Sequence, residues 1–66
     1  MVVDKSKIEI ILARRQMTAT TLCKKAGFSR NRFYEIMRSK KINPKTAGRV
    51  AEILGVDVTE IIEPEN

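Results

Sequence analysis

Apolar residues recur along this chain at spacings of three and four, the period of an amphipathic helix, and no segment alternates as a strand would. The first such stretch predicts a helix over about residues 4–15. Its buried face carries Ile8, Ile11 and Leu12. Asp4 and Ser6 are both possible N-caps, and Ser6 with Glu9 also fits a capping box, so the start of this helix stays open by one turn.

Two short helices are predicted between residues 18 and 38, because each would start at a good N-cap residue, Thr18 or Ser29. Each cap is directly preceded by an apolar residue and is followed by another one four positions later. Such a pair is a hydrophobic staple, and its contact sets the angle at which the chain enters a helix. These pairs are Met17 with Leu22 and Phe28 with Phe33. Gly27 separates the two helices and suits the left-handed backbone that ends a helix. The segment therefore predicts a helix-turn-helix.

A fourth helix is predicted over residues 44–54. Asn43 suits its N-cap, Pro44 its first helical position and Gly55 the residue after its end. Its apolar face comprises Ala47, Val50, Ala51 and Leu54.

A last short helix is predicted at about 58–62 by the capping box that Asp57 forms with Glu60. Its apolar residues are Val58, Ile61 and Ile62. These are more apolar residues than one short helix needs to pack against the rest of the domain, so part of this surface is a candidate homodimer interface. Burial in the chain's own core explains them equally well, and both interpretations stay open.

The chain has 66 residues, which is near the lower size limit for a domain that folds on its own core. A core of this size supplies about 3–5 kcal/mol, so close helix packing or dimerisation is expected to assist it. Together the segments predict one compact all-α domain of five helices over residues 1–66. The helix-turn-helix occupies about 18–38, and no second domain is expected.

Composition argues against an enzyme or a metal site. The chain has no histidine for acid–base chemistry or metal binding and no glycine-rich phosphate loop, so no cofactor is expected. Cys23 is the single cysteine, and its position after Leu22 predicts a small buried side chain rather than a nucleophile. No apolar run approaches the ~18 residues that span a bilayer, and no signal peptide is evident. The expected location is cytoplasmic, with no membrane partner.

Charge is distributed unevenly along the chain. All 13 Lys and Arg residues lie between Lys5 and Arg49, whereas five of the eight acidic residues follow Val50. A basic body with an acidic tail predicts a polyanionic partner that faces the first part of the chain.

The predicted helix at 30–38 carries the strongest candidate chemistry. Its apolar side, turned toward the core, comprises Phe33, Ile36 and Met37, and its outward side comprises Arg30, Asn31, Tyr34, Glu35 and Arg38. Arginine can pair bidentately with guanine and asparagine with adenine, and residues near the start of a recognition helix reach base edges. Arginines at the first and third helical positions also oppose the helix dipole, so their presence favours DNA binding over a merely solvated surface.

Hydroxyl and cationic side chains around this helix are candidates for contacts with DNA phosphates. Arg32 lies to the side of the outward face, and lysines follow the helix end. Thr18 can add a hydroxyl or a backbone amide at the start of the preceding helix. The set is Thr18, Arg32, Lys40, Lys41 and Lys45.

Over about residues 8–62 the chain resembles the Cro/C1-type (Xre-like) helix-turn-helix family of phage repressors and small bacterial regulators. The matching positions are Thr18, Leu22, Cys23, Ala26-Gly27, Ser29, Phe33, Ile36, Ala51, Leu54-Gly55-Val56 and Glu60-Ile61-Ile62. The resemblance implies a compact five-helix domain that binds duplex operator DNA, commonly as a homodimer on a palindromic site. It also implies base reading by Arg30, Asn31, Tyr34 and Glu35, with Ser29, Arg38 and Lys40 nearer the phosphates.

Three positions depart from the family pattern. Ala19 replaces a glutamine that often anchors to phosphate at the start of the helix. Ser39 replaces a common glycine after the recognition helix, and Met37 replaces a common glutamate. The last two changes bear on how the chain leaves that helix.

The chain is therefore predicted to be a transcriptional regulator, and more specifically a repressor, that reads duplex DNA through the major groove without catalysis. Two alternatives stay open. An antitoxin-like or other protein-interaction module would use the apolar last helix and the acidic residues Glu63 and Glu65 to hold a regulatory protein partner, with secondary DNA binding. A nonspecific binder of nucleic acid or anionic membrane would use the basic body alone.

Overall fold

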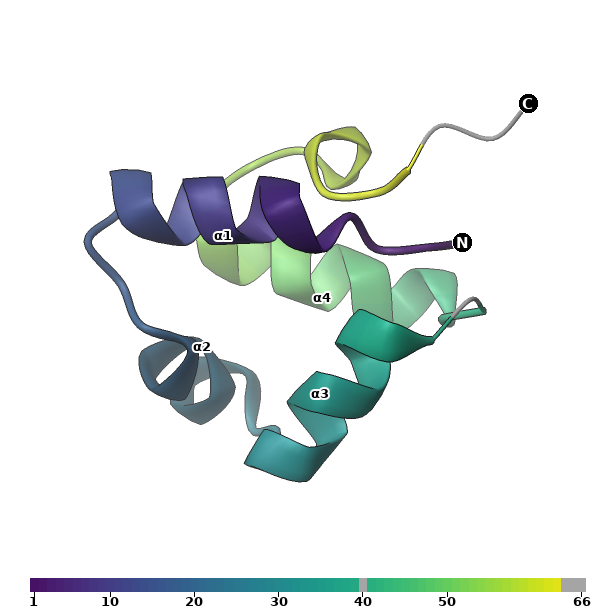
Figure 1. Cartoon of the computed structure of the whole chain (residues 1–66), viewed down its shortest axis with the longest axis horizontal. Coiled ribbons are helices and arrows are strands. Elements are labelled where there is room, and N and C mark those ends of the chain that lie inside the picture. The colour runs from purple at the N-terminus through teal and green to yellow at the C-terminus, as the bar shows by residue number, and fades with distance from the viewer. Residues whose placement is uncertain (40, 64–66) are drawn as a thin grey trace.

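The computed structural model describes residues 1–39 and 41–63, and over these residues four α-helices are followed by a 3₁₀ turn (Figure 1). In chain order they are α1 (Lys5–Arg14), α2 (Ala19–Ala26), α3 (Arg30–Arg38), α4 (Pro44–Leu54) and the turn Val58–Glu60. The only β-pairing within the described ranges is one isolated bridge. The predicted all-α class is therefore confirmed. The expectations for Lys40 and Glu65 fall outside the described residues.

The predicted N-caps begin the helices at the expected positions. Thr18, Ser29 and Asn43 each have extended backbone, and each side chain accepts a hydrogen bond from a backbone N–H of the first turn. The Asp4 carboxylate accepts a hydrogen bond from the N–H of Lys7 at 3.2 Å. The N-cap of α1 is therefore Asp4 and not Ser6. Each bond satisfies an amide that a helix start leaves without a partner, so local sequence determines these boundaries.

Glycines end α2 and α4 as predicted. Gly27 and Gly55 have φ angles of 76° and 72°, in the left-handed region that favours glycine. Arg15 also holds the end of α4, because its Nε donates to the carbonyl of Leu54 at 3.2 Å and its Nη2 to that of Gly55 at 3.4 Å. This cation complements the negative end of the α4 dipole and ties α1 to α4.

The same substitution should have opposite effects at two glycines. Gly27→Ala forces a side chain into left-handed backbone and should lower the free energy of unfolding by about 1 kcal/mol. Gly48 lies inside α4, where an added Cβ would meet no atom within 4 Å. Gly48→Ala should therefore raise the free energy of unfolding by about 0.4–1 kcal/mol. Urea denaturation measures both, and a stabilising Gly27→Ala would contradict the left-handed turn.

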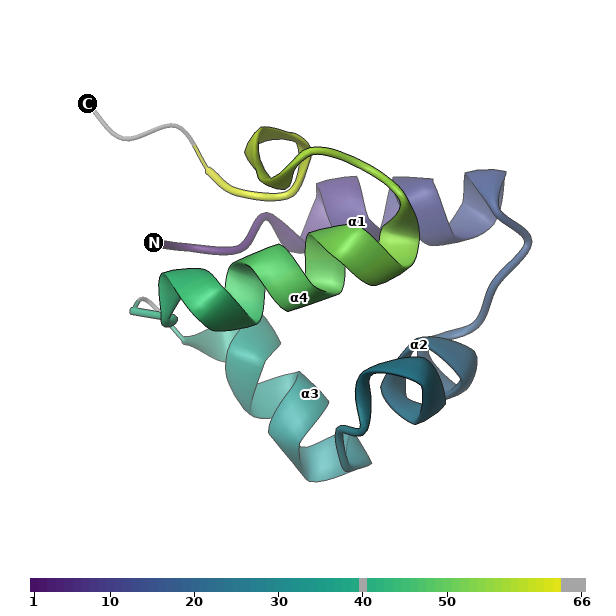
Figure 2. The same cartoon turned by 180° about the vertical axis from the view of Figure 1, so that it is seen from behind.

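The core lies where the helices and both terminal segments meet. α4 packs against α2 and the 3₁₀ turn, and α2 packs against α3. From both sides of the molecule, α2 and α3 lie on the same side of α1 and α4 (Figures 1 and 2). Cys23 is 4% exposed, as expected for a small buried side chain, whereas Met37 is only partly buried. The buried residues are Val3, Ile8, Ile11, Leu12, Leu22, Cys23, Phe33, Ile36, Ile42, Ala47, Val50, Ala51, Leu54 and Ile61.

The capping box of Asp57 and Glu60 is confirmed, but it opens a single 3₁₀ turn rather than the predicted helix over 58–62. The N–H of Asp57 donates to the Glu60 carboxylate at 3.2 Å. Hydrogen bonds from the hydroxyl and backbone N–H of Thr59 lower the pKa of Asp57, which favours its charged, capping form.

The N-terminal residues form hydrogen bonds with backbone groups of residues 61 and 63, which a continuing helix would bond within itself. The N–H of Asp4 donates to the carbonyl of Ile61 at 2.8 Å, and the N–H of Glu63 donates to the carbonyl of Val2 at 2.8 Å. Val3 and Ile62 form the antiparallel bridge between these segments. The chain after the turn is therefore engaged by its opposite end, a contact that no local pattern indicates.

Candidate nucleic-acid interface

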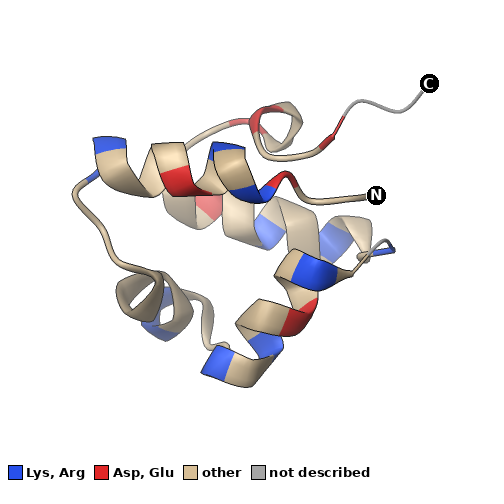
Figure 3. Ribbon diagram, viewed as in Figure 1, with Lys and Arg blue, Asp and Glu red and all other residues tan. Residues whose placement is uncertain are grey.

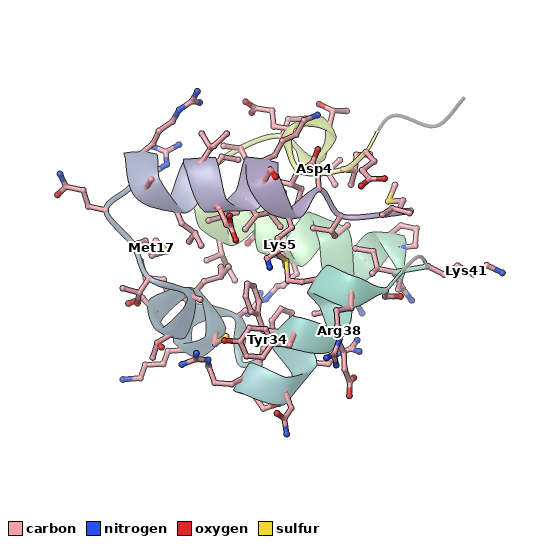
Figure 4. All side chains as sticks on the ribbon, in the orientation of Figure 1. Asp4, Lys5, Met17, Tyr34, Arg38 and Lys41 are labelled. Carbon is pink, nitrogen blue, oxygen red and sulfur yellow. The ribbon has the colours of Figure 1, made fainter. Side chains whose placement is uncertain are left out.

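α3 presents one side to the core and the other to solvent. Phe33 and Ile36 are 4% and 2% exposed, and they orient the helix. Figure 4 shows the side chains of Tyr34 and Arg38 extending from α3. All the residues predicted to face outward are exposed: Arg30, Asn31, Tyr34, Glu35 and Arg38, together with Arg32 at the side. The six side chains are all accessible, but they do not lie on one side of α3. Tyr34 and Arg38 line a hollow with residues of α1, whereas Arg32 and Glu35 line another with Ser39 and Asn43.

Arg30 is held in place although it is exposed. Its Nη1 donates to Thr20 Oγ1 on α2 at 2.8 Å, and its Nη2 donates to Tyr34 Oη one turn further along α3 at 2.9 Å. The guanidinium also lies 5.6 Å from the centre of the Tyr34 ring, within the range of a cation–π contact. The hydrogen bond to Tyr34 raises the pKa of Arg30, so the side chain stays cationic at any physiological pH.

Glu35, the one acidic residue of α3, pairs with a neighbouring cation. Arg32 Nη1 lies 3.8 Å from Glu35 Oε2, one turn apart on the same helix, and both side chains are more than half exposed. Exposed pairs of this kind contribute little to stability and are easily exchanged for other partners. Both groups therefore remain available to a ligand at this surface.

The start of α2 lies beside this surface. Thr18 Oγ1 accepts from the N–H of Thr21 at 3.1 Å and shares a hydrogen bond with the Thr21 hydroxyl at 3.1 Å. Thr18 is exposed, so its cap and the positive end of α2 are accessible. An exposed helix start of this kind attracts anions.

The chain leaves α3 through Ser39, which stands where the helix-turn-helix family that the sequence resembles commonly has glycine. Its φ of −71° lies in the ordinary region, so this exit does not require glycine. The Ser39 hydroxyl accepts from the N–H of Lys41 and donates to the carbonyl of Lys41, at 3.1 and 2.9 Å. The serine hydroxyl therefore holds both backbone groups of Lys41, which is exposed, as is Lys45.

Charge follows the arrangement of the helices. In Figure 3 the basic residues of α2, α3 and the first half of α4 lie away from the 3₁₀ turn. Acidic residues gather at the turn and just after it: Asp57, Glu60 and Glu63. The acidic residues of the turn thus lie away from the two helices of the helix-turn-helix. Basic residues of α1 lie beside the turn, however, and Lys7 Nζ donates to the carbonyl of Ile62 at 3.5 Å.

The family model for the Cro/C1-type HTH DNA-binding domain matches residues 7–66. The chain belongs to the Cro/C1-type helix-turn-helix family. The predicted resemblance is therefore confirmed, and the chain is a Cro/C1-type DNA-binding domain. Comparisons with curated proteins and with solved structures gave no match.

Two features are absent from the part of the chain that the structure describes. None of its helices has the length and apolar character needed to cross a bilayer. It contains no group of three or more His, Cys, Asp or Glu residues that could hold a metal ion.

Sequence reasoning missed Thr20. Thr20 is exposed on α2 and ten positions before its partner Arg30, so neither helical spacing nor a capping motif connects the two residues. Only the packing of α2 against α3 brings the hydroxyl to the guanidinium.

Proposed function

We propose that this chain is a sequence-specific transcriptional regulator that reads duplex DNA through the major groove with α3, and that it represses by occupying a promoter. The observation that carries the proposal is the exposed outward side of α3, which begins with Arg30 and Asn31. Residues at the start of a recognition helix reach base edges most readily. The family membership supports DNA binding itself.

The base-reading set comprises Arg30, Asn31, Tyr34 and Glu35. Arg30 suits guanine and Asn31 suits adenine, because each can form two hydrogen bonds to that base. Tyr34 accepts from Arg30 through its hydroxyl oxygen and keeps its own O–H to donate. Glu35 can accept from a cytosine amino group once its exposed pair with Arg32 opens.

The phosphate-binding set surrounds these residues. Thr18 and Ser29 offer exposed helix starts, and the arginines and lysines offer exposed cations. These contacts position the domain without reading sequence. The full set is Thr18, Ser29, Arg32, Arg38, Lys40, Lys41 and Lys45.

Selection of bound sites from random duplex DNA tests the proposal. We expect one enriched sequence, with two inverted half-sites about one helical turn apart if the protein binds as a homodimer. The enriched site should retain its preference over random DNA as salt is raised. Binding that disappears at raised salt with no preferred sequence would identify a nonspecific binder. Absence of DNA binding would favour the protein-interaction alternative.

The proposal includes a homodimer formed through the 3₁₀ turn and the residues after it, but not all of the candidate interface residues are accessible. Ile61 is 0% exposed, so its side chain is enclosed by the chain itself and offers nothing to a second subunit. Val58 and Ile62 are partly exposed and remain candidates. The proposed surface therefore consists of one side of the 3₁₀ turn and the residue that follows the buried Ile61.

A charged residue on this surface should weaken dimerisation more than it destabilises the domain, in which Val58 is only partly buried. Val58→Glu places two like charges near the two-fold axis and adds to the acidic character of the turn. We expect at least a tenfold weaker dimer by sedimentation, roughly 1.4 kcal/mol. Ala13→Glu, on the exposed side of α1, is the matched control. An unchanged sedimentation profile for Val58→Glu at micromolar concentration would reject this interface.

A further inference from the structure

The Arg30 side chain is fixed across the turn of the helix-turn-helix. An exposed arginine normally samples many rotamers, because its long stem carries a large side-chain entropy. Here three contacts converge on one guanidinium: a 2.8 Å hydrogen bond to Thr20 on α2, a 2.9 Å hydrogen bond to Tyr34 on α3, and the Tyr34 ring at 5.6 Å. The side chain is therefore restrained from two helices at once.

This restraint leaves donors for a ligand. A guanidinium has five N–H groups, and the two hydrogen bonds use two of them. Bidentate pairing with the O6 and N7 atoms of guanine requires two more. Three donors remain, one each on Nε, Nη1 and Nη2, and the bidentate contact requires that two neighbouring ones of these point toward the base.

We propose that Thr20 is a positioning residue for guanine recognition, holding the Arg30 guanidinium from α2 in the geometry that reads the base. The inference rests on the proposed function, in which Arg30 reads a base. Thr20 then contributes to sequence preference without touching DNA. Its hydroxyl is an acceptor on a rigid helix, so it fixes one edge of the guanidinium, while Tyr34 fixes the other.

An arginine side chain that is held in one orientation discriminates between bases better than one that is free to move. A mobile arginine must be immobilised when DNA binds, and it can also turn to a phosphate or to another base acceptor. Restraint in the free protein removes part of that ordering cost and reduces the alternative contacts. Loss of the Thr20 hydroxyl should therefore weaken the preference for guanine more than it weakens binding in general.

Thr20→Val removes the hydroxyl and keeps the shape of the side chain, and Thr20→Ser keeps the hydroxyl. Each variant is tested on the selected site and on the same site with the guanine read by Arg30 changed to adenine. Arg30→Ala identifies that guanine. We expect Thr20→Val to reduce discrimination at this base pair about 3- to 10-fold, and Thr20→Ser to restore it. Discrimination at the adenine read by Asn31 should stay unchanged in both variants.

A double-mutant cycle isolates the effect. Thr20→Val should change nothing further in the Arg30→Ala background, because the hydroxyl then has no guanidinium to hold. Thr20 is exposed, so the melting temperature of Thr20→Val should match that of the unaltered protein. Equal or greater guanine discrimination by Thr20→Val would overturn the inference, as would a selected site with no guanine that depends on Arg30. An unaltered protein without sequence preference would instead overturn the proposed function itself.

Discussion

Arg30→Ala is expected to reduce the preference of this protein for its selected site over random duplex DNA about 10- to 100-fold, because a bidentate contact to guanine is lost. Arg30 is exposed, begins α3 and already lies in a defined orientation. Asn31→Ala should cause a loss of similar size at a neighbouring adenine. Affinities for matched specific and random duplexes, measured at two salt concentrations, provide the test.

Lys45→Ala is the matched control, since Lys45 is an exposed cation at the start of α4 and belongs to the phosphate-binding set. It should weaken binding to all sequences by a similar factor and reduce the salt slope by about one. A parallel loss on specific and random DNA for Arg30→Ala, Asn31→Ala and Lys45→Ala alike would reject the assignment of base-reading residues.

Ile61→Ala should unfold most of the protein. Ile61 is fully buried, and truncation of a buried isoleucine to alanine costs about 2–5 kcal/mol. A core of this size supplies only about 3–5 kcal/mol in total, so the loss is comparable to the whole stability. Urea denaturation followed by circular dichroism should show a midpoint close to zero denaturant.

Two comparisons distinguish a core residue from an interface residue. Ile10→Ala is the matched control, because Ile10 is 52% exposed on α1 and should lose little stability. The effect of Ile61→Ala should also be the same at low and high protein concentration, since the contacts of Ile61 lie within one chain. Near-normal stability combined with weaker dimerisation would show that Ile61 acts between subunits.

The helix boundaries could be predicted from the sequence because the interactions that determine them are local. A cap and the amide that it satisfies are two or three residues apart, as for Ser29 and Arg32. A left-handed glycine such as Gly27 likewise acts on the turn in which it lies. The outward side of α3 followed in part in the same way, because helical period places Asn31 opposite the buried Phe33. Arg30 is three positions before Phe33 and so lies near its side of the helix, where it is exposed as the first residue of α3.

Contacts between distant parts of the chain could not be predicted in this way. The last segment, about 58–62, had both a capping box and apolar residues at helical spacing, yet it is helical only as far as the 3₁₀ turn. The backbone of Val2 and Asp4 bonds to the residues after the turn, and this competition between opposite ends of the chain is absent from any local pattern.

The sequence by itself determined the four α-helical segments, the starts of α2, α3 and α4, the ends of α2 and α4, and the apolar side of each helix, because these properties depend on residues within one or two turns. Only the tertiary structure decided that Ile61 is enclosed by its own chain and that Thr20 on α2 holds Arg30 on α3. Both outcomes depend on how separate elements pack together, and helical periodicity carries no information about that packing. The residues expected to read DNA were thus evident from the sequence, whereas the residue proposed to position one of them was not.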